Sequence, residues 1–168
     1  TLVQSDELNN HLKHPNLRIV DASWHLPKAK RNGLEEFELE HLPGAVFLDL
    51  DEVSDQESEF PHTIPTEEYF SKKIGELGIG NDSWVVVYDT TGLFSAARVW
   101  WMFRAFGHER VSLLDGGLPK WKAENRSISH GRSETKPSQF RAVFNKQMFC
   151  DWESVQDHAK DQNSLILD

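Results

Sequence analysis

The chain has 168 residues, the size of one ordinary globular domain, which is enough to bury a hydrophobic core. Hydrophobic residues make up 38% of it, too large a share for a disordered polymer, and no apolar run approaches the length of a membrane span. The net charge of −9 leaves no broad basic surface for phosphate groups. We therefore expect neither nucleic acid nor a membrane as a partner.

The pattern of residues predicts an α/β fold, an open, mostly parallel sheet with helices on both faces. Four short runs rich in branched residues predict buried strands, and each ends in an aspartate. These strands are expected at residues 17–21, 45–49, 84–89 and 111–115. Helical patterns between them are expected to begin at Ser5, near Leu34, at Thr66 and at Ser95.

The two ends of the chain resemble each other. Residues 151–168 repeat the pattern of residues 4–21 at a constant offset of 147 residues, so that Asp21 corresponds to Asp168. An internal repeat at a domain-sized spacing suggests a tandem duplication. We therefore expect a first domain at residues 1–125, an interdomain linker at 126–150, and the first helix and strand of a truncated second domain at 151–168.

Several short motifs occur in one order along the chain. They are Asp21-Ala22-Ser23-Trp24, His41-Leu42-Pro43-Gly44-Ala45, Phe60-Pro61-His62, Arg98-Val99-Trp100-Trp101 and Leu113-Leu114-Asp115-Gly116-Gly117. In this order they resemble the rhodanese-like sulfurtransferases, and more closely the two-domain thiosulfate and 3-mercaptopyruvate sulfurtransferases. The resemblance implies an enzyme that moves sulfane sulfur from either donor, through a cysteine persulfide, to cyanide or a thiol acceptor, with no cofactor.

Catalytic domains of this family carry a cysteine directly after a central strand, in a loop whose N–H groups stabilise a thiolate and then a persulfide. In this chain that position holds Asp89, and a carboxylate cannot carry sulfur. The resemblance therefore implies that the nucleophilic cysteine lies beyond Asp168, in a C-terminal rhodanese domain that is the partner of this part. This fragment alone is expected to be inactive. Cys150 has Asp151 beside it and no strand-to-helix loop, so we expect an ordinary or interfacial cysteine.

The resemblance also implies assisting side chains that face the cysteine loop of the second domain. By residue order, Asp51 fixes the tautomer of a histidine, His62 moves protons, and Arg141 binds the carboxylate of the substrate. Trp24 is expected to pack in the cleft or at the domain interface. Spacing alone leaves ordinary alternatives open: a turn cap for Asp51, a loop histidine, a solvated arginine and a core tryptophan.

A second candidate function is a non-enzymatic rhodanese-like module that binds a protein partner, for which Asp89 in the cysteine position is the expected substitution. A related phosphatase needs a cysteine followed by five residues and an arginine, a pattern that the sequence lacks. No Cys and His residues have metal-ligand spacing, so we expect no metal. The single cysteine and the polar amino terminus lead us to expect the cytoplasm, with the mitochondrion as the alternative for a eukaryotic protein.

Overall fold

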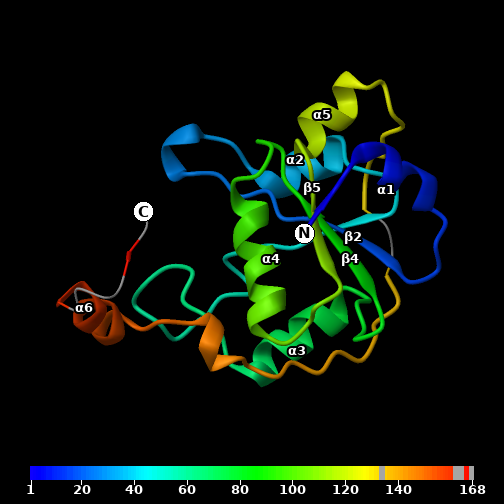
Figure 1. Ribbon diagram of the computed structural model, residues 1–168. Helices are drawn as coiled ribbons and strands as arrows, with labels where there is room; N and C mark the ends of the chain where they lie inside the picture. The colour runs from blue at the N-terminus through cyan, green and yellow to red at the C-terminus, as the bar shows by residue number, and fades with distance from the viewer. Residues whose placement is uncertain (133–134, 161–164, 167–168) are drawn as a thin grey trace.

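A computed structural model of the chain describes residues 1–132, 135–160 and 165–166, in which five parallel strands form one open sheet in the order β1-β5-β4-β2-β3 (Figure 1). The strands are β1 (Leu2–Val3), β2 (Leu17–Asp21), β3 (Ala45–Phe47), β4 (Trp84–Tyr88) and β5 (Val111–Leu114). The helices are α1 (Ser5–His11), α2 (Gly33–Leu39), α3 (Glu67–Glu76), α4 (Ser95–Ala105), α5 (Gly117–Ala123) and α6 (Trp152–Lys160), with short 3₁₀ helices η1 (Pro27–Ala29) and η2 (Lys146–Met148). No helix in these ranges is long and apolar enough to cross a membrane.

The predicted fold class is confirmed, and all four predicted strands are present. The structure adds β1, whose two residues pair with Leu113 and Leu114 of β5 at the edge of the sheet. Two residues are too few to form a hydrophobic pattern, which is why sequence periodicity missed this strand.

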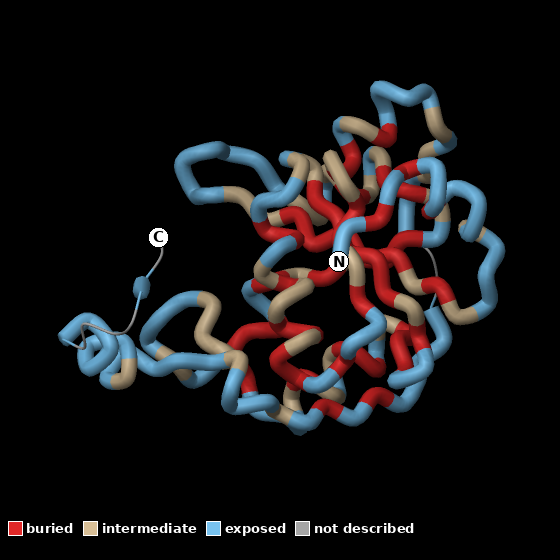
Figure 2. Tube along the Cα trace, in the orientation of Figure 1, coloured by how far each residue is buried: buried red, intermediate tan, exposed pale blue. Residues whose placement is uncertain are grey.

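Alternating side chains of the central strands fill two separate cores, as expected for a sheet covered on both faces. Figure 2 shows the buried residues, in red, gathered along the strands and the chain segments around them. In β4, Val85 and Val87 pack with residues of α3 and α4. On the opposite face, Val86 and Tyr88 pack with residues of α1, α2 and α5. Because all strands are parallel, their carboxyl ends lie at one edge of the sheet, and the loops that leave this edge are the natural place for a site.

The predicted linker packs on the first domain along much of its length. Ser129 pairs with His41 through two backbone hydrogen bonds, and the N–H of Ser138 donates to the carbonyl of Gly75. Phe140 and Ala142 are buried in the core on the side of α3 and α4. The segment is therefore part of the folded body, and the boundaries at residues 125 and 150 stay a prediction.

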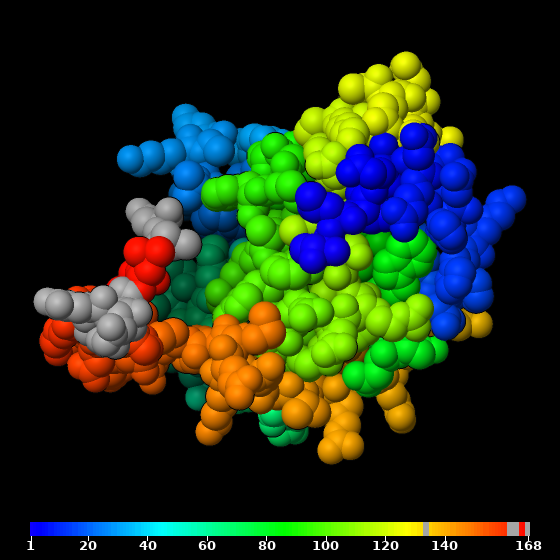
Figure 3. All heavy atoms as spheres, in the orientation of Figure 1, coloured from blue at the N-terminus to red at the C-terminus, as the bar shows by residue number. Residues whose placement is uncertain are grey.

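The predicted helix of the second part is present as α6, which lies to one side of the molecule at the red end of the chain (Figure 3). None of its residues is buried, and Val155 is 41% exposed, whereas Leu8, its counterpart in the repeat, is fully buried. The strand predicted to follow includes residues 167–168, which lie outside the described residues.

His108 is buried in the core, and its burial predicts that the stability of the fold depends on pH. Its ring lies 5.6 Å from those of Phe103 and Phe140, and its buried Nε2 has no hydrogen-bond partner among the described residues. Burial lowers the pKa of His108, because the charged ring would lose its hydration. The unfolded chain therefore takes up this proton first, and stability falls as the pH drops below the ordinary histidine pKa of about 6.5.

We expect the wild-type chain to lose more unfolding free energy between about pH 7 and about pH 5 than the His108→Leu variant. Urea unfolding at the two pH values measures the difference. Phe140→Leu, which changes the same core without a titratable group, is the matched control and should lose as much between the two pH values as the wild type. Equal losses in wild type and His108→Leu would contradict this assignment.

Candidate active site

The segments that leave β2 and β4 are joined to each other at the carboxyl edge of the sheet. The N–H of Thr90 donates to the hydroxyl of Ser23 at 3.0 Å, and the N–H of Trp24 donates to the hydroxyl of Ser95 at 3.1 Å. These bonds hold Trp24 beside the first turn of α4. The hydroxyls of Ser23, after β2, and of Ser95, at the start of α4, therefore hold the backbone on both sides of this contact.

Asp51, His62 and Trp24, three of the predicted site residues, meet at this edge. The Nε2 atom of His62 lies 2.8 Å from Oδ1 of Asp51, and the indole N–H of Trp24 donates to Oδ2 of the same carboxylate at 3.1 Å. The rings of Trp24 and His62 meet edge to face at 4.6 Å. A carboxylate can only accept here, so Nε2 carries a proton, and in the neutral form of the ring Nδ1 is the acceptor.

The local backbone explains why these side chains meet although eleven positions separate Asp51 and His62. The carboxylate of Asp49 accepts the N–H of Asp51 at 2.9 Å, which turns the chain just after β3. The following loop closes on itself where the N–H of Asp55 donates to the carbonyl of Thr63 at 2.9 Å. The pair stays open to solvent, because the Asp51 side chain is 65% exposed and the His62 side chain 23%.

Asp89 lies on the same edge, directly after β4, in the loop where the family resemblance places the cysteine. Its carboxylate accepts six hydrogen bonds at donor–acceptor distances from 2.6 to 3.1 Å. The donors are the backbone N–H groups of Thr91, Gly92, Leu93, Phe94 and Ala96 and the hydroxyl of Thr91. This ring of N–H groups is a cradle for an anion, and in this chain the carboxylate of Asp89 fills it.

Two buried aspartates at this edge have pKa values shifted in opposite directions. Burial raises the pKa of Asp21, whose Oδ2 has no hydrogen-bond partner among the described residues. At Asp89 burial also acts to raise the pKa, but the backbone N–H groups of the cradle outweigh it and hold the pKa below its ordinary value. The fold thus stabilises negative charge at Asp89.

Gly117 lets α5 approach the Asp89 loop closely. It has φ +54, and a Cβ atom built on it would lie 2.5 Å from the Asp89 carbonyl oxygen and 3.1 Å from Cα of Gly92. We expect Gly117→Ala to lower the free energy of unfolding by about 2–3 kcal/mol in urea denaturation. Gly44→Ala is the control, because Gly44 has φ +75 with open space around it, so it isolates the backbone cost of about 1 kcal/mol. Equal losses of unfolding free energy in the two variants would show that the close approach of α5 to the Asp89 loop does not affect stability.

The structure does not bring Arg141 to this cluster. Its side chain is exposed, and its backbone N–H and carbonyl are both hydrogen-bonded by the side chain of Asn81, which precedes β4 at the opposite edge of the sheet. Cys150 is an exposed free thiol between η2 and α6, outside any turn that follows a strand. Arg141 therefore does not share an edge of the sheet with Asp51 and His62.

Sequence reasoning also missed two polar groups near this edge. Arg98, in the first turn of α4, donates from a terminal nitrogen to the carbonyl of His62 at 2.7 Å. On the other side of Trp24, His25 lies 2.9 Å from Glu36, which also binds Arg31. An arginine at the start of an otherwise apolar helix is the signal that points to Arg98.

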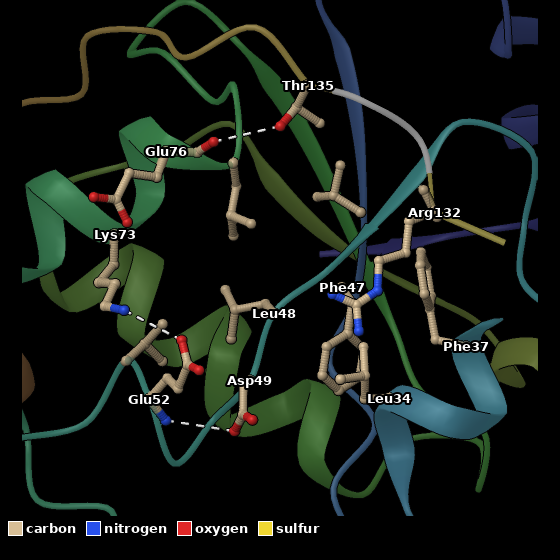
Figure 4. Close-up of a pocket in the computed structure, with 14 residues that line it drawn as sticks. Leu34, Phe37, Phe47, Leu48, Asp49, Glu52, Lys73, Glu76, Arg132 and Thr135 are labelled. Carbon is tan, nitrogen blue, oxygen red and sulfur yellow. Dashed lines mark hydrogen bonds and ion pairs between the residues drawn. The ribbon is translucent and has the colours of Figure 1, made fainter.

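A separate hollow follows the outer edge of β3 and contains none of the predicted site residues. Figure 4 shows Leu34 and Phe37 of α2 on one side of it, with Lys73 of α3 reaching Glu52 on the other. Trp24 and Asp51 line a different and smaller hollow instead. The two hollows adjoin at Leu34, Phe47 and Asp49, and the candidate active site is the one at the carboxyl edge.

The chain resembles known proteins over most of its length. The family model described as Rhodanese-like domain matches residues 4–124. The chain is 50% identical over 132 residues to "Thiosulfate/3-mercaptopyruvate sulfurtransferase 1, mitochondrial" of Arabidopsis thaliana, a match that covers 79% of this chain and 35% of that protein. It is 44% identical over 154 residues to human "3-mercaptopyruvate sulfurtransferase", with 90% of this chain and 52% of that protein covered. The chain thus spans about half, or less, of the length of these two relatives.

A solved structure extends the similarity to three dimensions. The crystal structure of SseA from Escherichia coli, described as showing the "Rhodanese" fold of 3-mercaptopyruvate sulfotransferases, superposes with a TM-score of 0.90 at 37% identity. The match covers 96% of this chain and 62% of that one. With the family match over residues 4–124 and the parallel five-stranded sheet, this places the chain in the rhodanese-like domain family.

Proposed function

We propose that this chain is the amino-terminal part of a sulfurtransferase that moves sulfane sulfur from 3-mercaptopyruvate or thiosulfate to cyanide or a thiol acceptor. The sulfur carrier is a cysteine persulfide in a second rhodanese domain of the same protein. The Asp51–His62 pair, joined at 2.8 Å on an open rim of the sheet, is the observation that carries the proposal. The names of the Arabidopsis and human relatives support the same donors.

The proposed chemistry assigns one task to each side chain of the pair. Asp51 holds the proton of His62 on Nε2, and Nδ1 then accepts a proton from a thiol or hydroxyl group of the substrate. When 3-mercaptopyruvate is the donor, its C–S bond breaks, the sulfur joins the cysteine, and the electron pair stays on carbon as an enolate. The imidazolium returns a proton to that enolate. Arg141 takes no part in this proposal, because it lies at the other edge of the sheet.

Asp89 supports the proposal that this chain and a second domain contribute different parts of the active site. It occupies the anion cradle that a catalytic domain of this family needs for its persulfide, so this chain supplies the rim and the second domain supplies the thiol. The exposed apolar side chains of Trp152 and Val155 on α6 are consistent with a further domain packing there. We keep residues 1–125, 126–150 and 151–168 as the proposed first domain, connection and start of the second.

We propose the cytoplasm as the location of this protein. The mitochondrion is the alternative, and the name of the Arabidopsis relative supports it.

The test compares this chain with a protein in which it is followed by the second domain. We expect the two-domain protein to form thiocyanate from cyanide with either donor, faster with 3-mercaptopyruvate, and this chain alone to form none. Cys150→Ala should leave the two-domain activity unchanged. Turnover by this chain alone that is lost in Cys150→Ala would overturn the proposal. An inactive two-domain protein would favour the non-enzymatic binding module.

A further inference from the structure

Arg98 contacts the proposed active site through a hydrogen bond to the backbone of His62. It lies in the first turn of α4, and it is half-buried. One terminal nitrogen donates to the His62 carbonyl at 2.7 Å. The contact joins the central helix of the domain to the loop that carries the histidine.

Among the residues that the structure describes, the guanidinium of Arg98 has no acidic partner. Its other described contact is with the face of the Trp101 ring, 4.4 Å from the ring centre, and its buried Nε has no hydrogen-bond partner within the described residues. Burial lowers the pKa of Arg98, which reflects the cost of keeping this charge partly out of water. A half-buried cation without a carboxylate stabilises the fold poorly, so its placement calls for another explanation.

His62 has a backbone conformation that needs support from its surroundings. Its φ is +59, in the left-handed region that costs a residue with a side chain about 1–2 kcal/mol. This conformation directs the ring toward Asp51, and the carbonyl of the same residue is the group that Arg98 binds. The hydrogen bond therefore holds the peptide that follows His62, on the carbonyl side of the residue whose ring contacts Asp51.

The stacking partner of Arg98 is itself fixed. The indole N–H of Trp101 donates to the carbonyl of Met148 in η2 at 3.0 Å, which holds the ring against the helix. The guanidinium thus lies between a fixed aromatic face and a strained peptide. Such a planar, rigid donor suits this position better than a flexible ammonium group.

We propose that Arg98 is a positioning residue, which holds His62 in its left-handed conformation and so keeps the imidazole aimed at Asp51. The positioning of His62 by Arg98 is a property of this chain alone, whereas its consequence for catalysis rests on the proposed function.

The first arm of the test uses nitrogen-15 NMR of the histidine rings in this chain. In the wild type we expect separate shifts for the two ring nitrogens of His62, with the proton on Nε2, and an indole N–H of Trp24 shifted by its bond to Asp51. In Arg98→Met both signatures should collapse toward solvent-averaged values, and Arg98→Lys should restore part of them. Arg104→Met, on the same helix, is the control and should leave both unchanged. Unchanged signatures in Arg98→Met would overturn the inference.

The second arm measures turnover of the two-domain protein. We expect Arg98→Met to lower kcat about tenfold, and the double variant with His62→Ala to be no slower than His62→Ala alone, because both act through one group. Additive losses in the double variant would overturn the inference. Collapsed NMR signatures with unchanged turnover would leave the positioning role intact and refute the catalytic role of the pair. Near-UV circular dichroism of each variant checks the fold, and Arg98→Lys carries the test if Arg98→Met unfolds.

Discussion

Replacing Asp89 by alanine is expected to lower the free energy of unfolding by about 3–5 kcal/mol, among the largest effects of a single substitution. The side chain is 1% exposed and accepts six hydrogen bonds, five of them from backbone N–H groups that converge on it. Without the carboxylate, these donors stay in the cradle with no acceptor, and each carries a desolvation penalty. Urea unfolding of Asp89→Ala measures the loss.

Asp89→Asn keeps the shape of the side chain and removes its charge. Comparing this variant with the wild type therefore isolates the contribution of the charge to stability. Because the folded-state pKa of Asp89 lies below that of the unfolded chain, the contribution of the carboxylate is fully present above about pH 4. This contribution is lost as the pH falls through the lower folded-state pKa. The difference in unfolding free energy between wild type and Asp89→Asn should therefore narrow at these pH values. Asp115→Asn, directly after β5, is the control and should change stability less, because Asp115 is partly exposed, with 34% of its side chain accessible in its pair with Lys120. A stable Asp89→Ala variant would show that water replaces the carboxylate without cost.

In the two-domain protein, His62→Ala and Asp51→Asn are each expected to lower kcat by about 10²–10³-fold. Alanine removes the proton acceptor. Asparagine allows the ring proton to move from Nε2 to Nδ1, so that the nitrogen facing the substrate can no longer accept. Steady-state kinetics with 3-mercaptopyruvate measures the change.

The same variants are expected to unfold at nearly the wild-type urea concentration, because the Asp51 side chain is 65% exposed and the pair lies on the rim. Glu59→Gln, an acid of the same loop, serves as the matched control and should keep wild-type turnover. If His62→Ala turned over as fast as the control, the pair would be a structural feature of the loop and the proposed mechanism would be wrong.

The cradle around Asp89 explains why its variants are expected to change stability, unlike the variants of Asp51 and His62. In this chain the N–H groups of the loop after β4 converge on the carboxylate of Asp89 and stabilise the domain. We therefore expect Asp89 to matter for folding, and Asp51 and His62 to matter for turnover.

The amino-acid pattern was sufficient for the fold class and for most elements. Runs such as residues 84–88 and the apolar side of α4 carry their own periodicity, so their type is readable without tertiary contacts. The order of strands and helices then implies a parallel sheet, and a parallel sheet implies that Asp21 and Asp89 end at the same edge. The two-residue strand β1 was not readable, because only its pairing with β5 defines it.

The family resemblance named Asp51, His62, Trp24 and Arg141 by their order in the chain, and order does not determine which edge of the sheet a loop side chain reaches. Tertiary structure alone brought Asp51 and His62 to 2.8 Å and left Arg141 beside Asn81 at the other edge. The reason is physical: strand and helix periodicity is a local property of the backbone, whereas the direction of a loop side chain depends on distant partners. For His62 that partner is Arg98, which is 36 positions away and binds its carbonyl.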